Sequence, residues 1–182
     1  MIYLLDNSTK PRRWLDETPY IEDGEFRIGQ SMTVKIPTPL EYTLKKLNPD
    51  SADHAPFMPE YFARDYPLFR DDFIEALKAF GVKNMELYEA SIHDPDNGKT
   101  YKNYRAFNVA GVLPMLVLGA DVTEEEDVVD GSGFDVEADT KGLSLFRIEN
   151  SFQLFVDERL NDHLSKLNFE GITFLDPRKC AL

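Results

Sequence analysis

The sequence contains few residues of the kind that form disulfides or metal sites. Of its 182 residues, one is a cysteine, Cys180, and three are histidines, His54, His93 and His163. A single thiol makes no disulfide within the chain, which favours a reducing compartment. No histidine has a second histidine or a cysteine at the spacing of a metal site, so we expect no metal ligands.

Long hydrophobic runs are also absent. No apolar stretch approaches the roughly 20 residues that a membrane-spanning helix needs. The N-terminal stretch MIYLLDNSTKPRR places its apolar residues before its charges and is too short for a signal peptide. We therefore expect a soluble, cytoplasmic protein that does not bind membranes.

Positive charge is scarce. The chain has 20 Lys and Arg residues against 33 Asp and Glu residues, for a net charge of -13. This balance disfavours nucleic acid and anionic membranes as partners and favours a basic protein. A simpler interpretation is that the acidic surface only keeps the protein soluble.

Motifs of the common enzyme classes are missing. The glycines of GSG at 131–133 are followed by neither lysine nor a helix, and they lie among acids that would repel phosphate. The turn DPDNG at 94–98 has alternating acids, but a proline in its second place argues against a calcium loop. There is no Gly-x-Ser-x-Gly, and Cys180 has no reason to be an activated thiolate. We expect no catalytic residue and no cofactor.

Residues 71–80 are predicted to form the first of two main helices. Apolar residues recur there at helical spacing, Asp72 is the expected N-cap, and Gly81 is the expected stop. A strand follows directly. The predicted unit is therefore a helix that leads into a strand.

Residues 157–167 are predicted to form the second helix. Asp157 is the expected cap, and Asn168 is expected to end the helix in the left-handed conformation. The sequence GITF then continues as a strand. Two helix-to-strand units suggest a sheet covered by helices.

Several stretches alternate apolar and polar residues, or are continuously apolar, in the manner of strands. They are 2–5, 32–36, 40–44, 85–92, 101–109, 143–148 and 152–156. Asn97-Gly98 predicts one hairpin, and the polar residues at 149–151 predict another. The prediction is an α+β fold, with a mostly antiparallel sheet built from hairpins and the two helices packed on it. Residues 1–182 are expected to form a single domain, with a smaller N-terminal lobe over about residues 1–50 as the alternative.

Residues 48–69 are rich in proline and aromatic residues and have no sustained period, which predicts a long ordered loop. Its aromatic residues are Phe57, Tyr61, Phe62, Tyr66 and Phe69. These rings either plug into the core or form an exposed contact surface.

Residues 121–139 form an acidic tract, with nine acids and no base. Two glycines interrupt it, so it is expected to be a solvated loop or hairpin edge with a concentrated negative field. The residues expected to contact a partner are Glu124, Glu125, Glu126, Asp127 and Asp130.

Four short motifs occur in an order that resembles one protein family. They are NVAG at 108–111, LFRI at 145–148, FVDERL at 155–160 and GITF at 171–174. Together with the capped helix near 71–80 and the variable acidic connection, this order is similar to a bacterial polymorphic-toxin immunity family, the one numbered eleven in the immunity classification. The similarity covers roughly residues 70–175.

The resemblance implies a small cytoplasmic protein that binds a cognate toxin and blocks it, and that is not an enzyme. The toxin would present a basic active-site groove to the acidic tract. Two other classes of function remain open. One is a small hydrolase that uses scattered carboxylates with His54 or His93, and the other is an adaptor or assembly protein that binds through residues 48–69.

Overall fold

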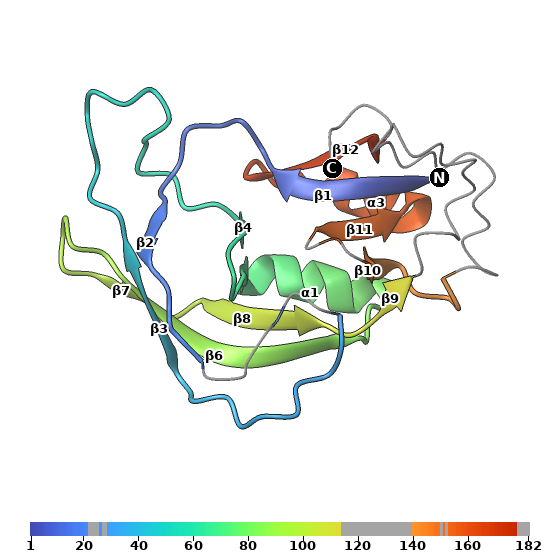
Figure 1. Ribbon diagram of the computed structural model, residues 1–182. Helices are drawn as coiled ribbons and strands as arrows, with labels where there is room; N and C mark the ends of the chain where they lie inside the picture. Colours follow the sequence, from blue (N-terminus) through green and yellow to red (C-terminus); the bar gives the residue numbers. More distant parts are fainter. Residues whose placement is uncertain (22–25, 27–28, 114–139, 150, 152, 178–182) are drawn as a thin grey trace, which may run out of the picture.

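The chain folds into two β-sheets with its helices between them (Figure 1). The computed structural model describes residues 1–21, 26, 29–113, 140–149, 151 and 153–177. Among the described residues, the smaller sheet has five strands. In spatial order they are β12 (Ile172–Leu175), β1 (Ile2–Asn7), β11 (Leu154–Asp157), β10 (Leu145–Ile148) and β9 (Val112–Leu113).

The larger sheet has seven strands in the described part of the chain. In spatial order they are β2 (Leu15–Glu17), β3 (Leu40–Leu44), β6 (Met85–His93), β8 (Tyr104–Val109), β5 (Leu68–Arg70) and β4 (Tyr61–Phe62), with β7 (Thr100–Tyr101) paired to β6. The pairings of β3 with β6 and of β9 with β10 are parallel. The other described pairings are antiparallel, and both predicted hairpins are present.

Helices α1 (Asp71–Phe80) and α3 (Glu158–Leu164) contribute to one core between the sheets, and the 3-10 helix η2 (Ser165–Leu167) continues α3. The α+β class with two main helices is confirmed. The described strands divide between two sheets, however, and the helices are covered on both sides. The buried residues of α1 explain this arrangement, because Phe73, Ile74, Ala76 and Leu77 cover a wide arc of the helix.

The bounds predicted for α1 are confirmed, but the N-cap is not Asp72. Arg70 occupies the N-cap position in an extended conformation and makes no side-chain cap hydrogen bond. The carboxylate of Asp72 instead accepts hydrogen bonds from the Arg70 guanidinium, with Nε at 2.7 Å from Oδ1. The cap prediction is wrong because the helix begins at Asp71, so that Asp72 already lies within its first turn. Gly81 ends the helix as predicted, in the left-handed conformation at φ 111°.

The start and end of the second helix follow the prediction. Asp157 caps α3, because its Oδ1 accepts the N–H of Leu160 at 2.7 Å. Asn168 adopts the left-handed conformation after η2, at φ 53°. β12 follows, so the chain passes from α3 directly to the edge of the smaller sheet.

The strand predicted at 32–36 is wrong. These residues form no strand, although Ile36 is buried and Met32 and Val34 pack beside it against the outer face of the larger sheet. The backbone N–H of Met32 donates to Glu86 Oε2 at 3.0 Å. The alternation of apolar residues therefore reflects packing over the sheet, not pairing within it.

Candidate protein-binding surface

The five acidic residues predicted to contact a partner lie outside the described residues. They are Glu124, Glu125, Glu126, Asp127 and Asp130. The described chain stops after β9 at Leu113 and resumes at Thr140, shortly before β10. β9 and β10 are neighbours at one end of the smaller sheet. The nearest described strands before and after the acidic tract therefore pair with each other at that end of the sheet.

The aromatic side chains of residues 48–69 mostly point into the protein. Tyr61, Phe62, Tyr66 and Phe69 are buried, and only Phe57 is partly exposed. The interpretation in which these rings fill the core is confirmed. A contact surface of five outward-facing rings, which the adaptor interpretation requires, is contradicted.

The three histidines occupy separate and unrelated surroundings. His54 Nδ1 accepts the N–H of Asn48 at 3.1 Å, His93 is exposed at the end of β6, and the ring of His163 lies 5.3 Å from that of Phe80. In the described part of the chain, no group of three His, Cys, Asp or Glu side chains is placed to hold a metal ion. The three histidines are therefore not brought together in the described part of the chain.

The acids of the DPDNG turn converge on a guanidinium. Arg13 Nη2 lies 3.0 Å from Asp94 Oδ1, and Arg13 Nη1 lies 2.6 Å from Asp96 Oδ2. The pKa of Asp96 is lowered, first by the hydrogen bond from the N–H of Leu47 and then by the one from Arg13. Arg13 and Asp94 are both buried. The alternating acids of this turn are therefore explained by an arginine that ties the β6–β7 turn to the N-terminal segment.

Glu86 of β6 joins the irregular segment near residue 32 to the larger sheet, because it accepts the backbone N–H of Met32. Its Oε2 accepts hydrogen bonds from Asn108 Nδ2 at 2.9 Å and from the Tyr88 hydroxyl at 3.2 Å. Burial alone would raise the pKa of Glu86, but these hydrogen bonds and the one from the N–H of Met32 lower it. Burial and the Glu86 carboxylate raise the pKa of Tyr88 to about 12.

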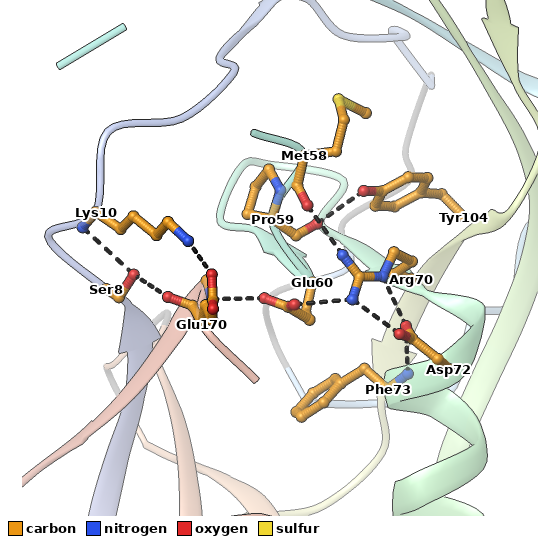
Figure 2. A network of polar contacts seen from close by, with 11 residues as sticks. Ser8, Lys10, Met58, Pro59, Glu60, Arg70, Asp72, Phe73, Tyr104 and Glu170 are labelled. Atoms are coloured by element: carbon orange, nitrogen blue, oxygen red, sulfur yellow. Dashed lines mark hydrogen bonds and ion pairs between the residues drawn. The ribbon is translucent and has the colours of Figure 1, made fainter. Parts of the chain in front are cut away.

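A buried carboxylate, Glu60, connects the two sheets (Figure 2). Its Oε1 accepts a hydrogen bond from Arg70 Nη2 at 2.8 Å, and its Oε2 accepts the N–H of Gly171 at 2.6 Å. Arg70 precedes α1 and Gly171 precedes β12, so one side chain joins the start of the helix to an edge of the smaller sheet. A Cβ at position 171 would lie 2.8 Å from Cα of Pro59, so this close approach requires glycine.

Arg70 joins the loop before β4 to the first turn of α1 (Figure 2). Its Nη1 donates to the C=O of Met58 at 2.9 Å, and its Nε and Nη2 both donate to Asp72. The hydrogen bond between Arg70 and Asp72 raises the pKa of the guanidinium and lowers that of the carboxyl group. Tyr104 donates its hydroxyl to the C=O of Pro59 at 2.8 Å. The network thus fixes the loop before β4.

A hollow of about 420 Å³ lies beside β12, between that strand and the end of the α3–η2 segment. Its apolar lining consists of Leu164, Phe169, Ile172 and Phe174, and its polar lining consists of Asn161, Ser165, Asn168 and Thr173. None of these side chains carries a charge. The hollow is therefore suited to an uncharged group, and its volume falls in the range of ligand pockets.

Sequence reasoning did not identify Glu60, Arg70 or the hollow. The partners of Glu60 lie far apart in the chain, since Gly171 belongs to the C-terminal part. For the hollow, the sequence offers one local signal, GITFL, which is an uncharged strand pattern that follows the end of a helix. This pattern predicts a strand, but it does not predict a cavity beside that strand.

Comparison with known proteins provides no relative. No family model matches the chain, and no match was found among curated proteins. Within the described residues, no helix combines the length and apolar character needed to cross a membrane. The resemblance to an immunity family therefore rests only on the order of the four motifs, the helix near 71–80 and the acidic connection.

Each of those four motifs contains a residue with a structural role. Asn108 of NVAG donates to the C=O of Gln30 at 2.7 Å, and the buried Arg147 of LFRI donates to the C=O of Phe26 at 3.2 Å. Asp157 of FVDERL caps α3, and Gly171 of GITF meets Glu60. The motifs describe how this fold is built, and they do not by themselves identify a binding surface.

Proposed function

We propose that this protein neutralises a cognate toxin protein by binding it through an acidic surface. The observation that carries the proposal is the concentration of nine acids and no base between residues 121 and 139, in a chain of net charge -13. A toxin that acts on nucleic acid must bind a polyanion and so presents a basic groove. A negative surface fits such a groove and accelerates association with it.

The described fold is consistent with a rigid binding protein. The buried Glu60 and Arg13 networks hold loops of different segments in one conformation. A surface that is already ordered loses less conformational entropy when it binds. The arrangement of the four motifs also favours this function over the hydrolase and adaptor alternatives.

The direct test is coexpression with the toxin domain encoded next to this protein. We expect cells to survive when both are expressed and to die when the toxin is expressed alone. The two proteins should also copurify from a strain that carries a tag on only one of them. Cell death despite coexpression, or the absence of an adjacent toxin gene, would contradict the proposal.

A further inference from the structure

The β6–β7 turn contains the one Asn-Gly step of the sequence, Asn97-Gly98. The side-chain amide of an asparagine can be attacked by the backbone nitrogen of the next residue, and glycine, which has no side chain, hinders that attack least. Both residues are exposed, and a Cβ built at Gly98 would meet no atom within 4 Å. The step is therefore open to water and has room to rearrange.

The reaction that this step allows is deamidation through a succinimide ring. The Gly98 nitrogen loses its proton to hydroxide and bonds to Cγ of Asn97, while the side-chain nitrogen takes up a proton from water and leaves as ammonia. Water then adds to one of the two ring carbonyls and breaks the bond from that carbonyl to the Gly98 nitrogen. Opening at Cγ gives aspartate, and opening at the main-chain carbon gives isoaspartate. Water is the only co-reactant that is consumed.

Two hydrogen bonds to Asp94 oppose this attack in the folded turn. The Gly98 N–H donates to the C=O of Asp94 at 2.8 Å, and a hydrogen bond to the protonated form disfavours loss of the proton. Asn97 Nδ2 donates to Asp94 Oδ2 at 3.0 Å, which restricts rotation of the side-chain amide. The N–H of Lys99 donates to Asn97 Oδ1 at 2.8 Å and polarises the amide carbonyl, so the protection comes from Asp94.

Asp94 is itself firmly held. It is 3% exposed, and its Oδ1 accepts hydrogen bonds from Arg13 Nη2 and from the N–H of Asp96, both at 3.0 Å. Its own N–H donates to the C=O of Lys99 at 2.8 Å. The group that opposes ring closure is therefore fixed by contacts on both sides of the turn and by the N-terminal segment. Local opening of the turn must break these contacts together.

We propose that Asn97 is a deamidation site that reacts when the β6–β7 turn opens, and that its product disfavours the closed turn. The aspartate product places a carboxylate oxygen where Asn97 Nδ2 now donates to Asp94. Two carboxylates at that distance repel each other, and the burial of Asp94 limits screening by water. Isoaspartate adds one methylene to the main chain and displaces Gly98 from the C=O of Asp94. The modification is thus a one-way step, and it does not depend on the proposed function.

Peptide mapping of the full chain measures the reaction. The protein is incubated at mildly alkaline pH, either folded or unfolded in urea, and is then cleaved with trypsin. The tryptic peptide 84–99 contains Asn97 and also Asn84, whose neighbour Met85 hinders the same attack. We expect the mass change from an amino to a hydroxyl group at Asn97, about tenfold or more faster in urea than in the folded protein, and a slower change at Asn84. Equal rates at Asn97 in folded and unfolded protein would overturn the proposal.

Two variants separate local opening from global unfolding. Asp94→Ala removes the carboxylate that holds Asn97 Nδ2 and should raise the rate in the folded protein about tenfold or more. Asp157→Ala removes a buried carboxylate of the smaller sheet and is the control for a loss of global stability. It should leave the rate at Asn97 much closer to that of the wild type. Equal acceleration in variants of equal global stability would show that the role of Asp94 is wrong.

Asn97→Asp reproduces one product and keeps Asp94 in place. Its matched control is Asn97→Ala, which removes the same donor without adding a charge. Hydrogen exchange, corrected for the intrinsic rate of each sequence, should show less protection of the Gly98 N–H in Asn97→Asp than in Asn97→Ala and in the wild type. Equal protection in the wild type and in Asn97→Asp would overturn the proposed effect of the product on the turn.

Discussion

At the scale of single residues, buried charges hold distant segments of this protein together. Glu60 and Arg13 are each only 3% exposed, and each pairs with charged or polar groups from other parts of the chain. A buried charge without its partner is strongly unfavourable. These groups therefore make particular loop conformations much more stable than their alternatives.

Glu60→Gln should lower the free energy of unfolding by about 2 kcal/mol, because the amide oxygen can accept from Arg70 or from the N–H of Gly171 but not from both, while Asp72 still pairs with the guanidinium. Urea denaturation of the purified variant measures this loss. Glu75→Gln is the matched control, since Glu75 pairs with Lys78 at the surface, and it should cost no more than about 1 kcal/mol. Equal losses in the two variants would contradict the assigned role of Glu60.

Asp72 should contribute to stability in a pH-dependent manner. Its folded-state pKa lies below the ordinary value of 3.8, mainly because of the hydrogen bond from Arg70. Its contribution is therefore fully present above that ordinary value and is lost as the pH falls through the folded-state pKa. Asp72→Asn should destabilise the protein near pH 7, and the difference should shrink in urea titrations below pH 4. A difference that is constant with pH would contradict this assignment.

At the scale of elements, the start of α3 depends on one carboxylate. Asp157 accepts the N–H of Leu160 with Oδ1, and its Oδ2 accepts the hydroxyl of Ser144 at 2.8 Å. Asp157→Ala should destabilise the protein by about 2 kcal/mol, at the upper end for a helix cap because the site is buried. Asp157→Asn keeps an acceptor and should cost less. Equal thermal stability of the two variants would show that the cap contributes little.

Local patterns were sufficient to predict most elements. The helix near 71–80 and the hairpin at Asn97-Gly98 follow from signals within a few residues, and both are present. The strand predicted at 32–36 failed because alternation reveals which side chains are buried, and not whether the backbone has a neighbouring strand. Pro37 and Pro39 close that segment, and Glu86 takes the N–H of Met32.

Long-range arrangements could not be predicted in this way. The division into two sheets depends on contacts between residues far apart in sequence, such as Glu60 with Gly171. The hollow depends on how α3 and β12 lie relative to each other, for which the sequence contains no local signal. The acidic tract was predicted from composition alone, and its role in binding stays a prediction.

At the scale of the whole molecule, charge should control the rate of binding. Conversion of Glu124, Glu125, Glu126, Asp127 and Asp130 to their amides should reduce the association rate with the cognate toxin at least tenfold at low salt, and should weaken its dependence on salt. Stopped-flow or surface-based kinetics at several salt concentrations would measure both effects.

The matched control removes five other negative charges at exposed positions of the described fold. They are Asp16, Glu17, Glu41, Asp50 and Glu89. Because the change in net charge is the same, this variant should slow association much less if the tract lies at the interface. Equal slowing in both variants would assign the effect to total charge and would remove the tract from the interface.

The pairing of β1 has a consequence for biosynthesis. A ribosome releases the chain in order, yet β1 lies between β11 and β12, the last two described strands. Ile2 and Leu4 are buried in the folded protein. They can be buried in this way only after the ribosome has released β11 and β12, which pair with β1. The smaller sheet, and the edge beside the hollow with it, can form only after translation of β12, so partially synthesised chains lack this surface.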